Sequence, residues 1–171
     1  MEYKLSVGFN GDLDLLEKMY ADKENKIGTL YTGGYLKEVT SGRYQHSKSE
    51  QELERIVEAV HDKNARLAVT LNSPCNVPPL SEKQWWENVK NYLKHLESIG
   101  VDTAIIAHPF IMALAKENTN LSVAASIICD VNTPRGALYY EDMGADVIVP
   151  SSSINSVSYT HLRAHETVLD L

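Results

Sequence analysis

RLAVTLN, residues 66–72, is a short, mostly apolar run whose composition favours a buried β-strand. Before it, apolar residues recur at helical spacing, at Leu53, Ile56, Val57 and Val60. After it, three prolines within residues 73–79 predict a loop, and a second helical stripe runs from Trp85 to Ile99. This order predicts a strand that is covered by the helices on either side of it in the sequence.

The same alternation continues in both directions along the chain. Further strands are expected at Tyr3–Gly8, Ile27–Tyr31 (broken by Gly33-Gly34), Thr103–Ala107, Leu121–Ala125 and Asp146–Val149. The runs Ala104-Ile105-Ile106 and Val147-Ile148-Val149 show no polar alternation, so we expect both of their faces to be buried, as in parallel sheets sheathed by helices. The repeat of about 25 to 30 residues is typical of successive βαβ units.

Local signals set the expected ends of the helices. Asp12 is placed to cap the first helix, and Ser49 with Glu52 has the form of a capping box. Ser81 with Gln84 has the same form and predicts the start of the long helix. Remaining signals are Thr133-Pro134 at a helix start, and Gly100 and Gly144 at helix ends.

Two α/β architectures agree with about six strands. A closed (β/α)8 barrel usually needs about 250 residues, and the chain has 171. The pattern therefore allows a partial (β/α)8 TIM-type barrel over residues 1–156, with parallel strands and outer helices, or a complete open sheet. A dinucleotide-binding sheet is disfavoured, because residues 8–13 read GFNGDL and not G-x-G-x-x-G. We favour the partial barrel.

Composition restricts the classes of function. The formal net charge of -7 gives no footprint for nucleic acid, and no run is long enough to span a membrane. The two cysteines, Cys75 and Cys129, are isolated, and no metal-binding motif is present. The first residues lack a secretory signal, so a cytoplasmic location is expected.

Candidate site residues follow from the barrel, because active groups in such folds lie at the carboxyl ends of the strands. The candidate catalytic residues are Asn72, His108, Ser126 and Asp130. The candidate substrate-binding residues are Asn10, Tyr35, Arg43, Asn132 and Ser151.

Each candidate has a structural alternative. Asn72 can hydrogen-bond loop backbone, His108 can cap the helix that starts at Pro109, and the serines after the sixth strand can cap a helix. Both cysteines can be buried small side chains. The order and spacing of Ser126, His108 and Asp130 identify no catalytic triad.

The succession of segments resembles peptidase family U32 over about residues 3–155. RLAVTLN, LESIGVDTAIIAHP (residues 96–109), LSVAASIICDVNT (121–133) and GADVIVPS (144–151) are similar to segments of that family in the same order. The matched positions are Asn72, Pro109, Ser126, Asn132 and Pro150. The chain departs from the family at residues 7–10, VGFN for the usual APAG, and at 150–152, PSS without the usual arginine and glutamate.

The resemblance implies a barrel module and one of two activities. One is a hydrolase, a collagenase-like protease of which this chain would be an inactive, truncated part. The other is iron–sulfur-dependent hydroxylation of tRNA, rRNA or a quinone precursor. The family's four cluster cysteines lie after the sixth strand, and Cys75 and Cys129 do not match them, so no cofactor is expected in this chain. A complete small α/β ligand-binding domain without catalysis is the remaining alternative.

Residues 157–171, VSYTHLRAHETVLDL, break the pattern. This stretch resembles a translated sequencing adapter, and we expect a non-native tail. His161 and His165 share the spacing of a metal-binding helix, but Leu162 stands where H-E-x-x-H has glutamate. No site is predicted there.

Overall fold

The computed structural model describes residues 4–22, 26–36, 38–39, 49–73, 78–156 and 159–160. Six parallel strands form one sheet in the sequential order β1-β2-β3-β4-β5-β6. Their bounds are β1 Leu5–Gly8, β2 Ile27–Gly33, β3 Arg66–Leu71, β4 Thr103–Ile106, β5 Ser122–Ala125 and β6 Val147–Ile148. An open doubly wound sheet reverses its strand order at a switch point, so the sequential order and the curl of this sheet confirm the partial TIM-type barrel.

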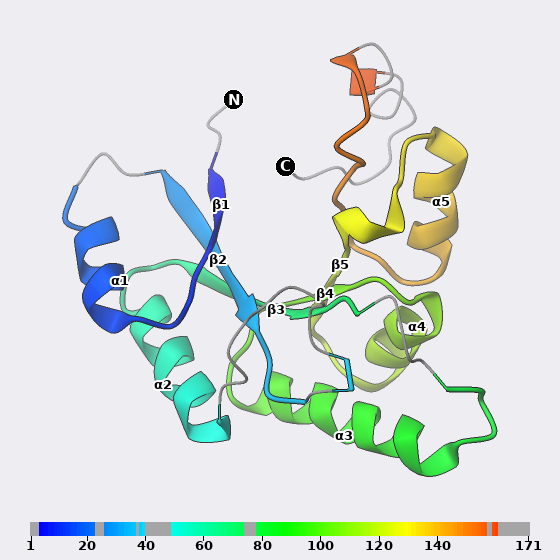
Figure 1. Ribbon diagram of the computed structural model, residues 1–171, viewed down its shortest axis with the longest axis horizontal. Coiled ribbons are helices and arrows are strands. Elements are labelled where there is room, and N and C mark those ends of the chain that lie inside the picture. Colours follow the sequence, from blue (N-terminus) through cyan, green and yellow to red (C-terminus); the bar gives the residue numbers. More distant parts are fainter. Residues whose placement is uncertain are drawn as a thin grey trace.

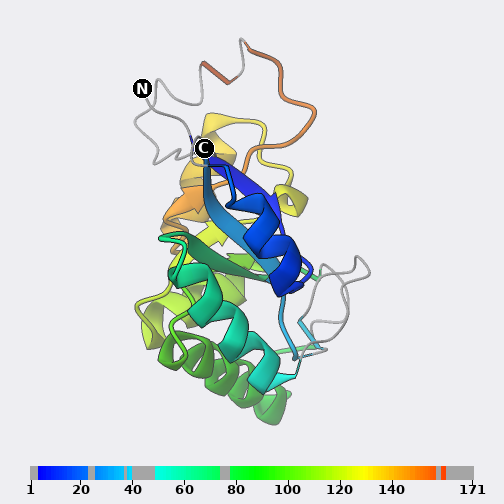
Figure 2. The same ribbon diagram turned by 90° about the vertical axis from the view of Figure 1, so that its left-hand side faces the viewer.

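A helix follows each of the first five strands. The helices are α1 Leu13–Met19, α2 Glu50–His61, α3 Lys83–Ser98, α4 Pro109–Asn118 and α5 Pro134–Asp142, with a short 3₁₀ turn, η1, at Ile127–Cys129. Figure 1 shows the helices following one another in chain order around the curled sheet. In Figure 2, α1, α2 and α3 are stacked in blue, teal and green on the face toward the viewer. No helix in the described ranges is long and apolar enough to cross a membrane.

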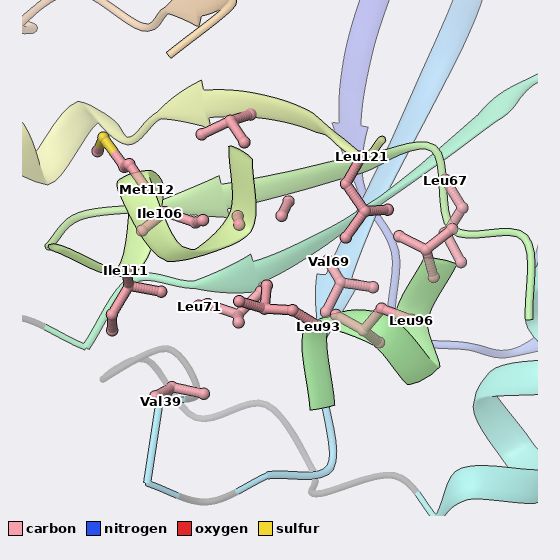
Figure 3. Packing of buried hydrophobic residues seen from close by; sticks show 14 of the residues in the cluster. Val39, Leu67, Val69, Leu71, Leu93, Leu96, Ile106, Ile111, Met112 and Leu121 are labelled. Carbon is pink, nitrogen blue, oxygen red and sulfur yellow. The ribbon is translucent and has the colours of Figure 1, made fainter. Parts of the chain in front are cut away.

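The hydrophobic core lies between the sheet and this helical layer. Leu67, Val69 and Leu71 of β3 alternate toward the helices, where Leu93 and Leu96 of α3 pack against the sheet (Figure 3). All five side chains are at most 1% exposed. Complete burial of one such side chain contributes about 1.5 to 3 kcal/mol, so the contact between β3 and α3 is a main source of stability.

The opposite face of the sheet is less completely buried than the sequence predicts. Thr70, Ile105, Ala124 and Val147 are in register across β3 to β6, and the alternation of side chains places them on the barrel-interior face. Ile105 and Val147 are only partly buried. The expectation that both faces of β4 and β6 are buried is therefore wrong, because a curled sheet of six strands does not enclose its interior.

A repeated Gly-x-Asp unit starts two of the strands. Gly100 and Gly144 each follow a helix with positive φ, 89° and 100°. Asp102 then accepts a hydrogen bond from the backbone of Leu67 at 2.8 Å, and Asp146 accepts one from Val123 at 2.8 Å. Each carboxylate thereby joins the start of its own strand to the start of the neighbouring strand. These residues stabilise the end of the sheet opposite to the candidate site.

Most of the predicted helix starts are confirmed. Asp12 accepts from the backbone N–H groups of Asp14 and Leu15. The capping box of α2 is complete: Ser49 Oγ accepts from Glu52 at 3.2 Å, and Glu52 Oε2 accepts from Ser49 at 2.7 Å. Thr133 caps α5 through Gly136, with Pro134 in the first turn as predicted.

The capping box predicted at Ser81 and Gln84 is wrong. Helix α3 begins at Lys83, its N-cap residue is Glu82, and no side chain caps it. Gln84 points along the helix and donates to Asn88 Oδ1 at 3.0 Å. A turn occupies this position, because Glu82 N–H donates to Pro79 O and Lys83 N–H donates to Ser81 O.

Strand β2 is longer than predicted. It runs through Gly33, which pairs with Thr70 of β3. The strand ends at Gly33, and at the next residue, Gly34, a Cβ atom would overlap the hydroxyl group of Tyr92. The two glycines therefore do not break the strand at Tyr31: Gly33 continues it, and Gly34 lets α3 approach its end.

Candidate functional site

Two polar residues meet at the carboxyl ends of β3 and β5. Asn72 directly follows β3 and is 9% exposed, and Ser126 directly follows β5 and is 1% exposed. Asn72 Nδ2 donates a hydrogen bond to Ser126 Oγ at 3.2 Å, although strand β4 lies between their strands. The Oδ1 atom of Asn72 is buried and has no hydrogen-bond partner among the described residues. A buried acceptor without a donor is costly, so this atom calls for a partner that the described residues do not supply.

Ser126 also organises the turn that follows β5. Its Oγ accepts from the backbone N–H of Ile128 at 3.3 Å, which caps η1. This turn leads to Asp130, whose backbone is left-handed, with φ 51° and ψ 42°. Left-handed non-glycine residues are uncommon, although Asp adopts this conformation more readily than most. The conformation directs the chain from β5 toward the end of β6.

A second polar group joins the ends of β5 and β6. Ser151 Oγ donates to Asp130 Oδ1 at 2.5 Å and lies 2.7 Å from Ser153 Oγ. The Ser153 backbone N–H also donates to Ser151 Oγ, and the Ser151 N–H donates to Val131 O. Ser151 is 4% exposed. The sequence predicted Asp130 and Ser151 separately, and the structure brings them together.

His108 lies between β4 and α4 in a different environment. It occupies the N-cap position of α4 but its side chain makes no capping hydrogen bond, so the capping alternative is wrong. Its Nδ1 atom is buried without a hydrogen-bond partner in the described ranges. The ring lies between Trp86 and Phe110, at centroid distances of 6.1 and 5.8 Å. Burial lowers the pKa of His108 below its ordinary value of 6.5.

Cys129 is a partly buried thiol that contacts backbone carbonyl groups. Its Sγ atom is placed to donate to Ile106 O and Ala107 O, at 3.7 and 3.5 Å. Burial is the main cause that raises the pKa of Cys129, and a hydrogen bond with Tyr140 opposes the rise. A protonated thiol in this position is a poor ligand for iron. Cys75 lies outside the described residues.

Tyr35 is placed away from the strand-end pairs. Its ring packs edge-on against Tyr92 of α3 at 4.8 Å and lies 5.9 Å from the ring of His95. Burial, with the negative charges of Glu50 and Glu54, raises the pKa of Tyr35 to about 12. Tyr35 therefore belongs to the layer formed by α2 and α3.

The remaining predicted residues are at the surface or outside the described ranges. Asn10 is exposed, and its Oδ1 accepts from the backbone N–H of Asp12 at 3.0 Å, which shapes the turn before α1. Asn132 is exposed just before the cap of α5. Arg43 lies outside the described residues. Ser153, one of the serines after the sixth strand that the sequence pointed to, lies beside Ser151. Tyr140 was not selected, and only its proximity to Cys129 in the fold reveals it.

A shallow groove of about 440 Å³ lies elsewhere, between α3 and α4 on the outer surface. Its lining includes Leu80, Trp86, Phe110 and Leu114. It is largely apolar and contains none of the strand-end pairs. The chemistry available at the strand ends is instead hydrogen bonding: a carboxamide with a free acceptor, a buried hydroxyl, and a carboxylate already bonded to a serine.

Comparison with known proteins agrees with the resemblance seen in the sequence. The sequence model of the family described as "Peptidase family U32" matches residues 15–167. That range reaches into the predicted non-native tail, of which residues 157–158 and 161–171 lie outside the described part of the chain, and the tail stays a prediction. No curated protein matches the chain.

Solved structures resemble the fold. The structure of the U32 peptidase Mk0906 superposes with a TM-score of 0.76 at 19% identity, over 95% of this chain and 65% of that protein. The chain thus spans about two thirds of the length of that relative. The complex structure of a GH113 β-1,4-mannanase gives a TM-score of 0.55 at 13% identity, over 99% of this chain and 70% of that protein. At these identities the likeness concerns the fold alone.

Proposed function

The chain belongs to peptidase family U32, and we propose that it forms the first six strands of a peptidase barrel that binds a polypeptide at the carboxyl ends of β3, β5 and β6. The observation that carries this proposal is the buried Asn72 carboxamide, which is held by Ser126 and keeps an unpaired acceptor. It lies at the end of the barrel where substrates bind in this architecture.

A carboxamide with an unpaired acceptor suits a polypeptide main chain. Asn72 offers an acceptor through Oδ1 and a second N–H through Nδ2, and both groups have complements in a peptide backbone. Ser126 fixes the carboxamide, so less rotational entropy is lost on binding. We assign Asn72 and Ser126 to substrate binding in this proposal.

The pair formed by Asp130 and Ser151 is proposed to supply the proton chemistry. The Asp130 carboxylate already accepts the proton of Ser151 Oγ in a short hydrogen bond. Ionised carboxylates hold hydroxyl groups strongly and can remove a proton from a bound nucleophile. His108 remains a candidate acid or base. Its ring contacts within the described ranges are with Trp86 and Phe110.

The residues of this chain do not fit the iron–sulfur cluster of the hydroxylating members. A cluster is held by four cysteine thiolates, and the chain has two cysteines. The pKa of Cys129 is raised by burial, which favours the thiol over the thiolate.

We further propose that the chain does not turn over substrate by itself. It spans 65% of the U32 peptidase to which it is similar, and β1 and β6 form the two edges of its sheet. A sheet with open edges tends to pair with other chains. Sedimentation of the chain should show association that increases with concentration; a stable monomer at high concentration would favour the alternative of a complete small domain.

The test uses the full chain with fluorescein-labelled gelatin peptides. We expect binding in an anisotropy titration and no release of labelled fragments above a blank without protein. Asn72→Ala and Asp130→Ala should each weaken binding at least tenfold.

The matched control is Asn120→Ala, which removes an amide at the opposite end of β5, where Nδ2 donates to Glu97. It should bind as the unmodified chain does. Equal binding by the unmodified chain and by the Asn72→Ala, Asp130→Ala and Asn120→Ala variants would show that the site lies elsewhere. Hydrolysis that Asp130→Ala abolishes would uphold the site and refute the predicted inactivity, whereas binding of tRNA in place of gelatin would favour the hydroxylation alternative.

A further inference from the structure

Three side chains with metal-binding atoms converge in the helical layer, outside the strand-end site. They are Glu50 and Glu54 of α2 and His95 of α3, and one ligand atom from each lies within 4.8 Å of the others. Glu50 and Glu54 are one helical turn apart, so their carboxylates share a face of α2. His95 comes from a helix far away in the sequence. The fold therefore supplies two oxygen ligands and one nitrogen ligand at one place.

The contact between His95 and Glu50 lacks the geometry of an ordinary hydrogen bond. His95 Nε2 lies 3.0 Å from Glu50 Oε1, yet it is buried from solvent and has no hydrogen-bond partner among the described residues. A metal ion bound by both groups lies off the line that joins the nitrogen and the oxygen. A contact this close that is not aligned for a shared proton therefore suits a metal ion held by the two groups.

The two carboxylates have no lysine or arginine partner within the described ranges. In the described part of the chain, no lysine or arginine forms an ion pair with Glu50 or Glu54. The capping box of α2 uses Ser49 and Glu52, so neither carboxylate is needed to cap the helix. Tyr35 lies near enough to both for their charges to affect its hydroxyl group.

We propose that Glu50, Glu54 and His95 bind a divalent transition-metal ion such as Zn²⁺. Zinc bonds to imidazole nitrogen and carboxylate oxygen are about 2.0 to 2.2 Å, which separates tetrahedral ligand atoms by about 3.3 Å. The 3.0 Å contact between His95 and Glu50 is close to this value. The ligand atoms of the three residues lie up to 4.8 Å apart, so the exposed Glu54 side chain would have to rotate toward the ion. The fourth position is left to water or the Tyr35 hydroxyl. The bound ion would join α2 to α3. This metal-site proposal does not depend on the proposed peptidase function.

The test is a calorimetric titration of the full chain with Zn²⁺, in a background that carries His161→Ala and His165→Ala. This background removes the two histidines of the tail, whose spacing could bind metal by itself. We expect one ion per chain and an increase in Tm on binding. Cobalt titration should give the visible absorption of a low-symmetry site with a nitrogen ligand.

The variants locate the site. His95→Gln and Glu54→Gln should each weaken Zn²⁺ binding at least tenfold, and the exposed position of Glu54 makes its variant safe for folding. Glu58→Gln, one turn further along α2 and also exposed, is the matched control and should bind as the background does. Absence of binding, or binding that neither His95→Gln nor Glu54→Gln weakens, would overturn the proposal.

Discussion

The side-chain amide of Asn72, at the end of β3, donates a hydrogen bond to the hydroxyl of Ser126, at the end of β5, across the end of the intervening strand β4. In barrels of this type, alternate strands contribute the side chains of one interior layer. The pair therefore forms a polar layer at the carboxyl end of the half-barrel. The unpaired Oδ1 atom of Asn72 makes it the centre of the proposed site.

The first prediction separates binding from stability at this pair. Asn72→Leu loses one hydrogen bond but also removes an unpaired buried acceptor, and these effects are of similar size, about 1 to 3 kcal/mol. We expect the free energy of unfolding to change by less than about 1 kcal/mol while gelatin binding is lost. Urea unfolding and anisotropy measure the two effects.

Ser126→Ala provides the contrast. It leaves Asn72 Nδ2 and the Ile128 N–H without their acceptor, so unfolding should become easier by about 2 kcal/mol. Equal stability of Ser126→Ala and the unmodified chain would show that neither hydrogen bond matters for folding.

Asp130 should be sensitive to the shape of its backbone as well as to its charge. Asp130→Ala places an unfavourable residue in the left-handed region and removes the acceptor of Ser151, so we expect a loss of about 2 to 4 kcal/mol. Asp130→Asn tolerates the conformation and keeps an acceptor, so most of the stability should remain. Chemical denaturation compares them, and equal losses would contradict a backbone role.

Gly34 should not accept a side chain while Tyr92 is present. A Cβ atom at Gly34 would overlap the buried Tyr92 hydroxyl. Gly34→Ala should therefore destabilise the fold by about 1 to 3 kcal/mol. Tyr92→Phe alone should cost little, and the double variant should recover most of the loss. A double variant as unstable as the sum of the two would refute the steric explanation.

His108 should make the fold less stable in mild acid. Burial lowers its pKa in the folded chain below the ordinary value of 6.5, so the unfolded chain binds a proton first as the pH falls. Stability is unaffected above about pH 6.5 and decreases below it, down to the folded pKa. The difference in unfolding free energy between the unmodified chain and His108→Gln should shrink from pH 7.5 to 5. A constant difference would show that His108 does not titrate differently on folding.

Cys129 should react slowly in the folded protein. Burial raises its pKa and shields the thiol, and the thiolate is the form that is alkylated. At pH 8, iodoacetamide should modify the peptide that contains Cys129 far more slowly in the native chain than in guanidinium chloride. Mass spectrometry follows that peptide separately from the one with Cys75. Equal rates in both conditions would contradict the protection expected from partial burial.

Much of the fold could be predicted from the sequence because its signals are local. The apolar run RLAVTLN forms β3, and the stripe Leu53, Ile56, Val57 and Val60 is the buried face of α2. The capping box predicted at Ser81 and Gln84 was wrong, because a turn at Pro79 uses the same backbone groups. For the candidate site, the sequence named most of the strand-end residues, but not which of them meet.

By itself, the sequence determined the order of strands and helices along the chain, the parallel α/β class and the family resemblance, because periodicity and segment order are properties of neighbouring residues. The sequential order of the strands in the sheet came from the tertiary structure. Only the tertiary structure joined Asn72 to Ser126, and Asp130 to Ser151. It also places Tyr35 in the helical layer, beside the cluster of Glu50, Glu54 and His95. These contacts depend on the register and curl of the sheet and on how α2 and α3 pack, which bring together residues that are distant along the chain.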